Sequence, residues 1–181
     1  MKKYKEGEIM EFLDIIDEDG NYTGEVMERE KVHELNLFHW EVSVFLINDK
    51  GEVLLQKRAA TKKLNPNMWG SCAGHVDSGE GLEESALREL EEEIGLKLSI
   101  DDLHVLDEKQ VTKHERNSHL TKVYYVYYNG NDFKIQTEEL SEVKWFNIDD
   151  IIEMIKNNDK SITFNPDRIY LFEDLKKIIK K

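Results

Sequence analysis

The stretch GHVDSGEGLEESALRELEEEIGL, residues 74–96, carries the features that decide the fold of this chain. Its first half is rich in glycine and predicts a loop whose backbone bends easily. Its second half predicts a helix, and Gly95 follows where a left-handed C-terminal cap is expected. The apolar residues of this half recur three and four positions apart and form one buried stripe: Ala86, Leu87, Leu90 and Ile94.

The same helix carries seven glutamates and one arginine between residues 80 and 93. Neighbouring carboxylates on a helix repel one another, so the cluster needs a physical reason. Glu89, Glu92 and Glu93 project from one side, which we expect to be the exposed face opposite the apolar stripe. Carboxylate oxygens suit Mg²⁺ or Mn²⁺, and Arg88 is placed to orient a carboxylate. The spacing alone fits either a divalent-metal site or a solvated helix face.

Length and composition limit the class of protein. With 181 residues, 39% of them hydrophobic, the chain can form a core of its own, and we expect a single domain over residues 1–181. A formal net charge of −13 argues against a nucleic-acid polymer as partner. The single cysteine, Cys72, excludes an intrachain disulfide and fits a reducing compartment. Without an apolar run long enough for a signal peptide or a membrane span, the expected location is the cytoplasm, away from membranes.

The remaining segments predict a mixture of strands and helices. Residues 1–36 are expected to form an N-terminal extension with a hairpin, because EFLDIID and GEVMER flank the turn residues EDGN. The best hairpin signal is EVSVFLI, residues 41–47, followed after NDKGE by VLLQKR, residues 53–58. Helical periodicity returns in DDIIEMIKNN and in PDRIYLFEDLKKIIKK. This mixture predicts an α/β/α or α+β sandwich.

Residues 74–96 also resemble the signature of the Nudix family. That signature reads Gly, five residues, Glu, seven residues, Arg-Glu, an aliphatic residue, any residue, Glu-Glu, any residue, Gly and an aliphatic residue. Nine defined positions coincide by chance on the order of once in a billion windows. The matching residues are Gly74, Glu80, Arg88, Glu89, Leu90, Glu92, Glu93, Gly95 and Leu96.

The resemblance implies a Nudix fold, an α/β/α sandwich of the α/β (α+β) class with a mixed β-sheet. Residues 74–96 would form the Nudix box and hold Mg²⁺ or Mn²⁺. It further implies hydrolysis of a diphosphate linkage in a small molecule, often a nucleoside diphosphate derivative. The resemblance leaves open which of the box glutamates acts as the general base. The implied roles are metal ligation or general base for Glu89, Glu92 and Glu93, orientation for Arg88, a carbonyl ligand from Ala73, and contact with the diphosphate for Gly74.

A second resemblance includes the segments before the box. The order GNYTGEV, EKVHELNLFHWEVSVFL and LLQKRAATKKLNPNMWGSCAGH is similar to type 1 isopentenyl diphosphate isomerase, a Nudix-fold enzyme that moves a double bond by proton transfer. This resemblance implies a second metal site at His33, His39 and His75, since histidine is a common ligand of transition metals. It also implies diphosphate contacts from Arg58 and Lys62.

Three departures favour a hydrolase over an isomerase. The catalytic cysteine of the isomerase directly precedes Gly-His, whereas Ala73 holds that place here and Cys72 lies one residue earlier. Because successive strand residues point to opposite faces, we expect the Cys72 thiol to point away from the site. The strand NSHLTKVYYVYY lacks the glutamates that the isomerase needs there, and the box glutamates are intact. The isomerase and a non-catalytic nucleotide-binding Nudix module stay as alternatives.

Basic residues near the box are further candidates for substrate binding. Lys57, Arg58 and Lys62 would contact phosphates, although a solvated turn uses the same residue types. We also expect a homodimer, formed by exchange of the N-terminal hairpin between two copies.

Overall fold

The structure is a computed structural model that describes residues 10–180. Residues 1–9 of the predicted extension lie outside the described residues. Strands and helices alternate along the chain, as the sequence predicts. The strands are β1 (Phe12–Ile16), β2 (Tyr22–Glu28), β3 (His39–Ile47), β4 (Glu52–Arg58), β5 (Trp69–Gly70), β6 (Cys72–His75), β7 (His104–Thr112), β8 (His119–Tyr127) and β9 (Leu140–Asn147). The helices are α1 (Arg29–Leu35), α2 (Leu82–Ile94), α3 (Ile148–Lys156) and α4 (Ile169–Ile179), with short 3₁₀ turns at Ile100–Asp102 and Pro166–Arg168.

Strand β3 is the centre of a mixed sheet. It pairs in parallel with β8 along its whole length and antiparallel with β6 on its other edge. The predicted hairpin between β3 and β4 is paired at only two positions, next to the turn. The two strands separate there because β6 takes over the edge of β3 while β4 pairs with β9 and β5.

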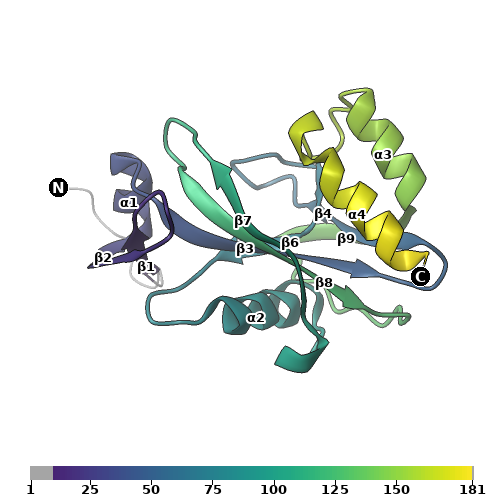
Figure 1. The fold of residues 1–181 in the computed structure, drawn as a ribbon, viewed down its shortest axis with the longest axis horizontal. Helices are drawn as coiled ribbons and strands as arrows, with labels where there is room; N and C mark the ends of the chain where they lie inside the picture. Colours follow the sequence, from purple (N-terminus) through teal and green to yellow (C-terminus); the bar gives the residue numbers. More distant parts are fainter. Residues whose placement is uncertain (1–9, 181) are drawn as a thin grey trace.

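Helices cover both faces of this sheet (Figure 1), which gives the predicted α/β/α sandwich. Helix α2 covers one face, where its Leu90 packs with Val42 and Val44 of β3. Helices α3 and α4 cover the other face, where residues of the opposite parity on β3, Phe45 and Ile47, pack. The alternation of side chains along β3 therefore builds two separate cores. None of the helices within residues 10–180 is long and apolar enough to cross a membrane.

The N-terminal hairpin β1–β2 and helix α1 form an extension at one end of the sheet (Figure 1). Its apolar residues Leu13, Ile15 and Val32 form a small cluster apart from the two cores of the sheet. The Asp14 carboxylate joins the extension to the box loop, because it accepts hydrogen bonds from the Ser78 hydroxyl and from a backbone amide at 2.9 Å each. The predicted hairpin is confirmed.

Helix α2 ends as its sequence predicts. Gly95 has a φ of +72°, and its amide donates to the Glu91 carbonyl at 3.0 Å. The segment between β8 and β9 passes close to this glycine, because the Lys134 amide donates to the Ile94 carbonyl at 2.9 Å. A Cβ atom on residue 95 would lie 2.8 Å from the Cβ of Lys134.

We expect Gly95→Ala to destabilise the protein by more than the roughly 1–2 kcal/mol that a left-handed conformation costs an L-residue. The additional loss comes from the contact with Lys134. The matched control is Gly24→Ala, because Gly24 has a φ of +86° with nothing within 4 Å of an added Cβ. Urea unfolding measures both free energies, and equal losses in the two variants would refute the contact argument.

Candidate active site and histidine cluster

The charged side of α2 faces strand β6. A Cβ atom on residue 74 would meet the carboxylate of Glu89, so any side chain there would displace that carboxylate from its place against β6. The structure shows a close approach of a box carboxylate to Gly74, and contact of Gly74 with a diphosphate stays a prediction. The glycine therefore brings the helix and its carboxylates onto the strand.

Arg88 holds the box together. Its Nη1 donates to the Glu89 carboxylate at 2.7 Å and to Glu92 at 3.3 Å. Its Nε and Nη2 donate to the Glu80 carboxylate at 3.0–3.2 Å, and Nη2 also donates to the His75 carbonyl at 2.9 Å. Arg88 thus orients Glu89, as predicted, and fixes the end of β6 as well.

Glu93 lies deeper than the sequence suggests. Only 6% of this residue is exposed, so the expectation that all three glutamates lie on an exposed face is wrong. Among the three, only Glu92 has a largely exposed side chain, at 54%. The reason is that Gly74 lets α2 approach β6, so the carboxylates of Glu89 and Glu93 lie between helix and sheet. Burial, followed by the charge of Glu89, raises the pKa of Glu93 to about 8.

Two observations show that the buried carboxylates fit a divalent cation. The Gln56 amide donates to Glu93 Oε1 at 3.0 Å, whereas Glu93 Oε2 has no partner within the described chain. A buried carboxylate oxygen without a partner is costly, and a hard cation would satisfy it. The three box glutamates do not converge fully, since no trio of ligand atoms within 4.8 Å in residues 10–180 includes one. Arg88 accounts for this, because it draws Glu89 and Glu92 to itself.

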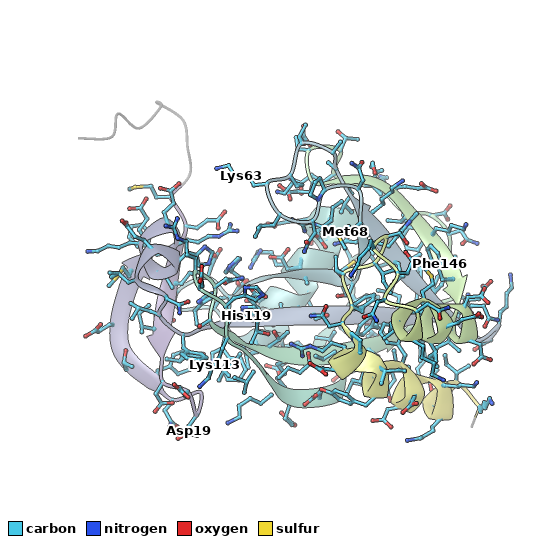
Figure 2. The ribbon with its side chains drawn as sticks, turned by 90° about the horizontal axis from the view of Figure 1, so that it is seen from above. Asp19, Lys63, Met68, Lys113, His119 and Phe146 are labelled. Atoms are coloured by element: carbon cyan, nitrogen blue, oxygen red, sulfur yellow. The ribbon has the colours of Figure 1, made fainter. Side chains whose placement is uncertain are left out.

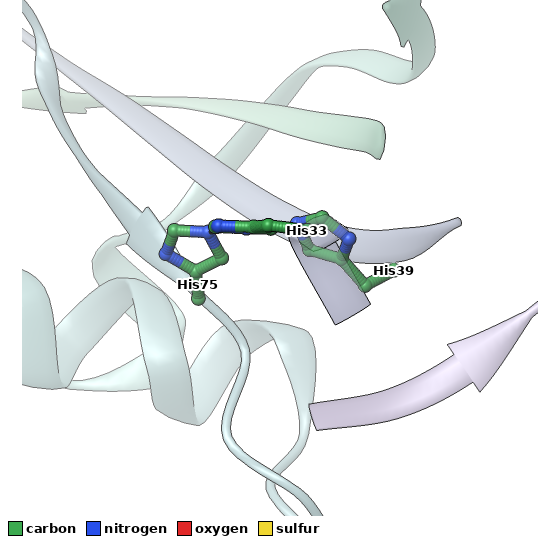
Figure 3. Close-up of side chains that lie close together, drawn as sticks. All are labelled: His33, His39 and His75. Atoms are coloured by element: carbon green, nitrogen blue, oxygen red, sulfur yellow. The ribbon is translucent and has the colours of Figure 1, made fainter. Parts of the chain in front are cut away.

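The histidines of the second predicted metal site do come together (Figure 3). His33 comes from α1, His39 from β3 and His75 from β6, and their ring centroids are 5.1–5.2 Å apart. One ligand atom from each lies within 4.8 Å of the others. Burial lowers the pKa of His39 to about 4 and that of His75 well below its usual value, so these imidazoles are neutral at pH 7.

Two further residues belong to this cluster and were missed in the sequence. The carboxylate of Glu41 lies 3.5 Å from His75 Nε2 and 3.3 Å from His119 Nε2. Burial raises the pKa of Glu41 to about 7 and lowers that of His119 to about 4. The strand register is the signal that identifies both residues. Glu41 follows His39 by two residues and so lies on the same face of β3. His119 pairs with His39 across the parallel strands.

Cys72 and Ala73 lie on opposite sides of β6, as the alternation of strand residues predicts. Cys72 belongs to the core beneath α2, and its thiol donates to the Gln56 amide oxygen at 3.5 Å. Burial raises the pKa of this thiol well above its usual value. Ala73 pairs with Ser43 and shares its strand face with His75. The place next to the histidines therefore holds a methyl group and no thiol.

The predicted basic cluster is spread over separate partners within the chain. Lys62 forms an ion pair with Glu139. The Lys57 ammonium lies 5.7 Å from the centre of the Trp69 ring. Arg58 donates through Nε to the Leu64 carbonyl at 3.0 Å. A role of these residues in substrate binding stays a prediction.

Comparisons with known proteins agree with this geometry. The family model described as the NUDIX domain matches residues 37–165. Isopentenyl-diphosphate Delta-isomerase 2 of Photorhabdus laumondii is 32% identical over 155 residues, which cover 81% of this chain and 83% of that protein. An uncharacterized Nudix hydrolase of Nostoc sp. is 33% identical over 132 residues, which cover 68% of this chain and 77% of that protein.

Solved structures share the fold. DR0079 from Deinococcus radiodurans superposes with a TM-score of 0.67 at 22% identity, over 94% of this chain and 98% of that one. The MutT protein from Methanosarcina mazei Go1 superposes with a TM-score of 0.64 at 23% identity, over 80% of this chain and 96% of that one. The chain belongs to the Nudix family, in its isopentenyl-diphosphate-isomerase-like subgroup. Membership indicates an enzyme that acts on diphosphate-containing substrates and typically uses a divalent metal.

We expect Glu93→Gln to stabilise the metal-free protein at high pH. Because the pKa of Glu93 in the folded state, about 8, exceeds the usual 4.5, wild-type stability falls as the pH rises from 4.5 to 8. The glutamine carries no charge and escapes this loss. With a chelator at pH 9, the Tm of the variant should exceed that of wild type by at least about 2 °C.

The pH series and a neighbouring variant control this prediction. The difference in Tm between wild type and Glu93→Gln should shrink as the pH falls toward 5, where Glu93 is protonated in the folded protein. Glu92→Gln is the matched control, because Glu92 is exposed and should show no such pH-dependent gain. An equal Tm for wild type and Glu93→Gln at pH 9 would contradict the buried placement.

Proposed function

We propose that this protein is a hydrolase that needs Mg²⁺ or Mn²⁺ and cleaves a diphosphate linkage, in a substrate such as a nucleoside diphosphate derivative. The observation that carries the choice of a hydrolase is the placement of Cys72 beneath α2, with Ala73 on the face of the histidines. An isomerase that transfers a proton to carbon through a thiol would need a thiol on that face, and Ala73 supplies none. The box, by contrast, has a buried carboxylate oxygen, Glu93 Oε2, without a partner in the described chain, which supports a divalent cation there for phosphoanhydride hydrolysis.

Each box residue has a role in this proposal. Glu89 and Glu93, with the Ala73 carbonyl, would hold the cation, and Arg88 keeps Glu89 in place against β6. A bound divalent cation would neutralise diphosphate oxygens and the charge that develops as water attacks phosphorus. One of the three glutamates, Glu89, Glu92 or Glu93, would take the proton from that water.

Isomerisation of isopentenyl diphosphate is the second candidate. Relatives that cover most of the chain are named isopentenyl-diphosphate isomerases, among them that of Photorhabdus laumondii. One observation favours this candidate: Glu41 supplies a carboxylate on the same strand face as His75, although β8 has none. A carboxylate there could serve proton transfer even without a thiol.

A panel assay separates the candidates. The substrates are nucleoside di- and triphosphates, nucleotide sugars, dinucleotides and isopentenyl diphosphate, each with Mg²⁺, with Mn²⁺ and with a chelator. Metal-dependent release of phosphate, pyrophosphate or a nucleoside monophosphate supports the hydrolase. Conversion of isopentenyl diphosphate into its isomer, without any release, would establish the isomerase instead. Thermal stabilisation by a nucleotide without any turnover would indicate a non-catalytic module.

On the substrate that is cleaved, Glu93→Gln and Glu92→Gln should each reduce kcat by at least about 100-fold, the usual minimum for a lost general base or metal ligand. Both variants should stay folded, since each keeps the shape of the side chain. Circular dichroism and steady-state kinetics with saturating Mg²⁺ measure the two properties. Full activity in either variant would remove that residue from the proposed site.

Cys72→Ala should keep the hydrolase activity of wild type, because the thiol is buried in the core and is no part of the proposed reaction. Its hydrogen bond to Gln56 is a long contact to sulfur and contributes little. Turnover and Tm are measured together on this variant. A loss of turnover without a loss of Tm would contradict the proposal and favour chemistry through the thiol.

A further inference from the structure

An open cavity lies between the N-terminal hairpin and the loop that leads into α2. Its volume of about 410 Å³ is in the range of sites that bind small molecules. The hairpin supplies one wall and the box loop supplies the other, and we call this space the hairpin cavity. The lining residues are Asp14, Tyr22, Gly24 and Glu25 of the hairpin and Gly79, Glu80 and Gly81 of the box loop.

The hairpin wall is held in place at both of its ends. Near the box loop, the Asp14 carboxylate accepts hydrogen bonds from the Ser78 hydroxyl and from a backbone amide of that loop at 2.9 Å each. At the tip, the Lys109 ammonium of β7 donates to the Asp19 carbonyl at 3.2 Å, and Figure 2 shows Asp19 close to Lys113, which follows β7. The cavity is therefore formed before a ligand arrives, which lowers the entropic cost of binding.

Glycines keep both walls open to a ligand. An added Cβ atom would meet none of the described residues within 4 Å at Gly24 or at Gly79. These two glycines have φ values of +86° and +82°, which disfavour any side chain there. At Gly81 the nearest atom to an added Cβ would be 3.5 Å away. A ligand can therefore approach the backbone of both walls closely.

The charge of the lining selects the chemistry of the ligand. Three of the lining side chains are carboxylates, and none of the described residues that line the cavity is basic, so a phosphate group is repelled. Tyr22 is 56% exposed and offers a flat apolar ring with a hydroxyl at its edge. Glu25 is exposed as well, so its carboxylate can accept hydrogen bonds from a ligand. An aromatic ring beside a carboxylate fits a sugar, whose hydroxyls donate hydrogen bonds and whose C–H face packs on the ring.

Glu80 connects the hairpin cavity to the box carboxylates. Its carboxylate accepts hydrogen bonds from Arg88 Nε and Nη2 at 3.0–3.2 Å. Arg88 Nη1 donates to Glu89 at 2.7 Å and to Glu92 at 3.3 Å. One arginine side chain therefore spans the space between the cavity wall and the proposed cation site. A group attached to a diphosphate at that site is within reach of the cavity.

We propose that the hairpin cavity binds the sugar of a diphosphate substrate, with the Tyr22 ring against the sugar and Glu25 as the acceptor for its hydroxyls. The phosphates belong at the box, because the carboxylates of the cavity repel them. The inference rests on the proposed hydrolase function and narrows its substrates to those with a sugar linked to the diphosphate. That sugar is either the ribose of a nucleotide or the second sugar of a nucleotide sugar.

The first test measures binding without turnover. The probe is a nucleotide sugar whose bridging oxygen is replaced by a methylene group, titrated calorimetrically in the presence of Mg²⁺. Tyr22→Ala should weaken its binding at least about 10-fold, and Glu25→Gln at least about threefold. The matched controls are Tyr127→Ala and Glu30→Gln, which change exposed residues outside the cavity and should bind as wild type does.

Kinetics identify which sugar the cavity holds. The substrates are a nucleotide sugar, the sugar 1-diphosphate without the nucleoside, and the nucleoside diphosphate without the second sugar. Tyr22→Ala should raise KM at least about 10-fold and leave kcat within about twofold, as expected for a contact made equally in the ground state and the transition state. A rise for the sugar 1-diphosphate identifies the second sugar, and a rise for the nucleoside diphosphate identifies the ribose.

Nuclear magnetic resonance locates the ligand on wild type without any variant. On addition of the methylene analogue with Mg²⁺, the amide resonances of Gly24, Gly79 and Gly81 should shift. Gly24 is decisive, because it belongs to the extension and not to the box. Gly51, which lies near Ile179 of α4, should not shift.

Two results would overturn the proposal. One is that wild type does not bind the analogue, or binds it without a shift of Gly24. The other is unchanged binding in both Tyr22→Ala and Glu25→Gln. Binding that shifts Gly24 and weakens in these variants, without turnover of any substrate, would support the cavity as a sugar site and refute the hydrolase function alone.

Discussion

The pairing of β3 with β6 on one edge and with β8 on the other is the constraint on which both sites depend. The register Glu41↔His75 places Ala73 and His75 on one face of the sheet and Cys72 and Gly74 on the other. A slip of one residue would exchange these faces, bury the histidine under α2 and set a side chain where Glu89 needs a glycine. Buried alternating residues on β3 hold the register, because each parity has its own core.

The box shows how the fold keeps like charges close together. Gly74 lets α2 lie against β6, and Arg88 and Gln56 each compensate part of the buried negative charge. This compensation is incomplete, since Glu93 Oε2 has no partner among residues 10–180 and the pKa of Glu93 is raised. A cation would supply the missing interaction, so the metal-free protein carries an electrostatic cost that binding removes. The same incompleteness explains why the box glutamates do not already form a closed set of ligands.

Local signals in the sequence predict much of the fold and of the box. The spacing of Leu90 and Ile94 and the cap at Gly95 define α2, and the signature of the box defines the family. The histidine trio came from a resemblance, and the structure brings it together. Glu41 and His119 were not found, because their place depends on the pairing of strands about 80 residues apart, which no local pattern encodes. The burial of Glu93 was misjudged because a run of charges normally indicates a solvated face.

Two adjacent residues of β6, Gly74 and His75, face opposite sides of the sheet and therefore meet different polar groups. The Glu89 carboxylate lies against Gly74 on the side of α2, whereas the His75 imidazole lies on the opposite face, beside the Glu41 carboxylate. Arg88 connects the sides, because it binds Glu89 and also the carbonyl of His75.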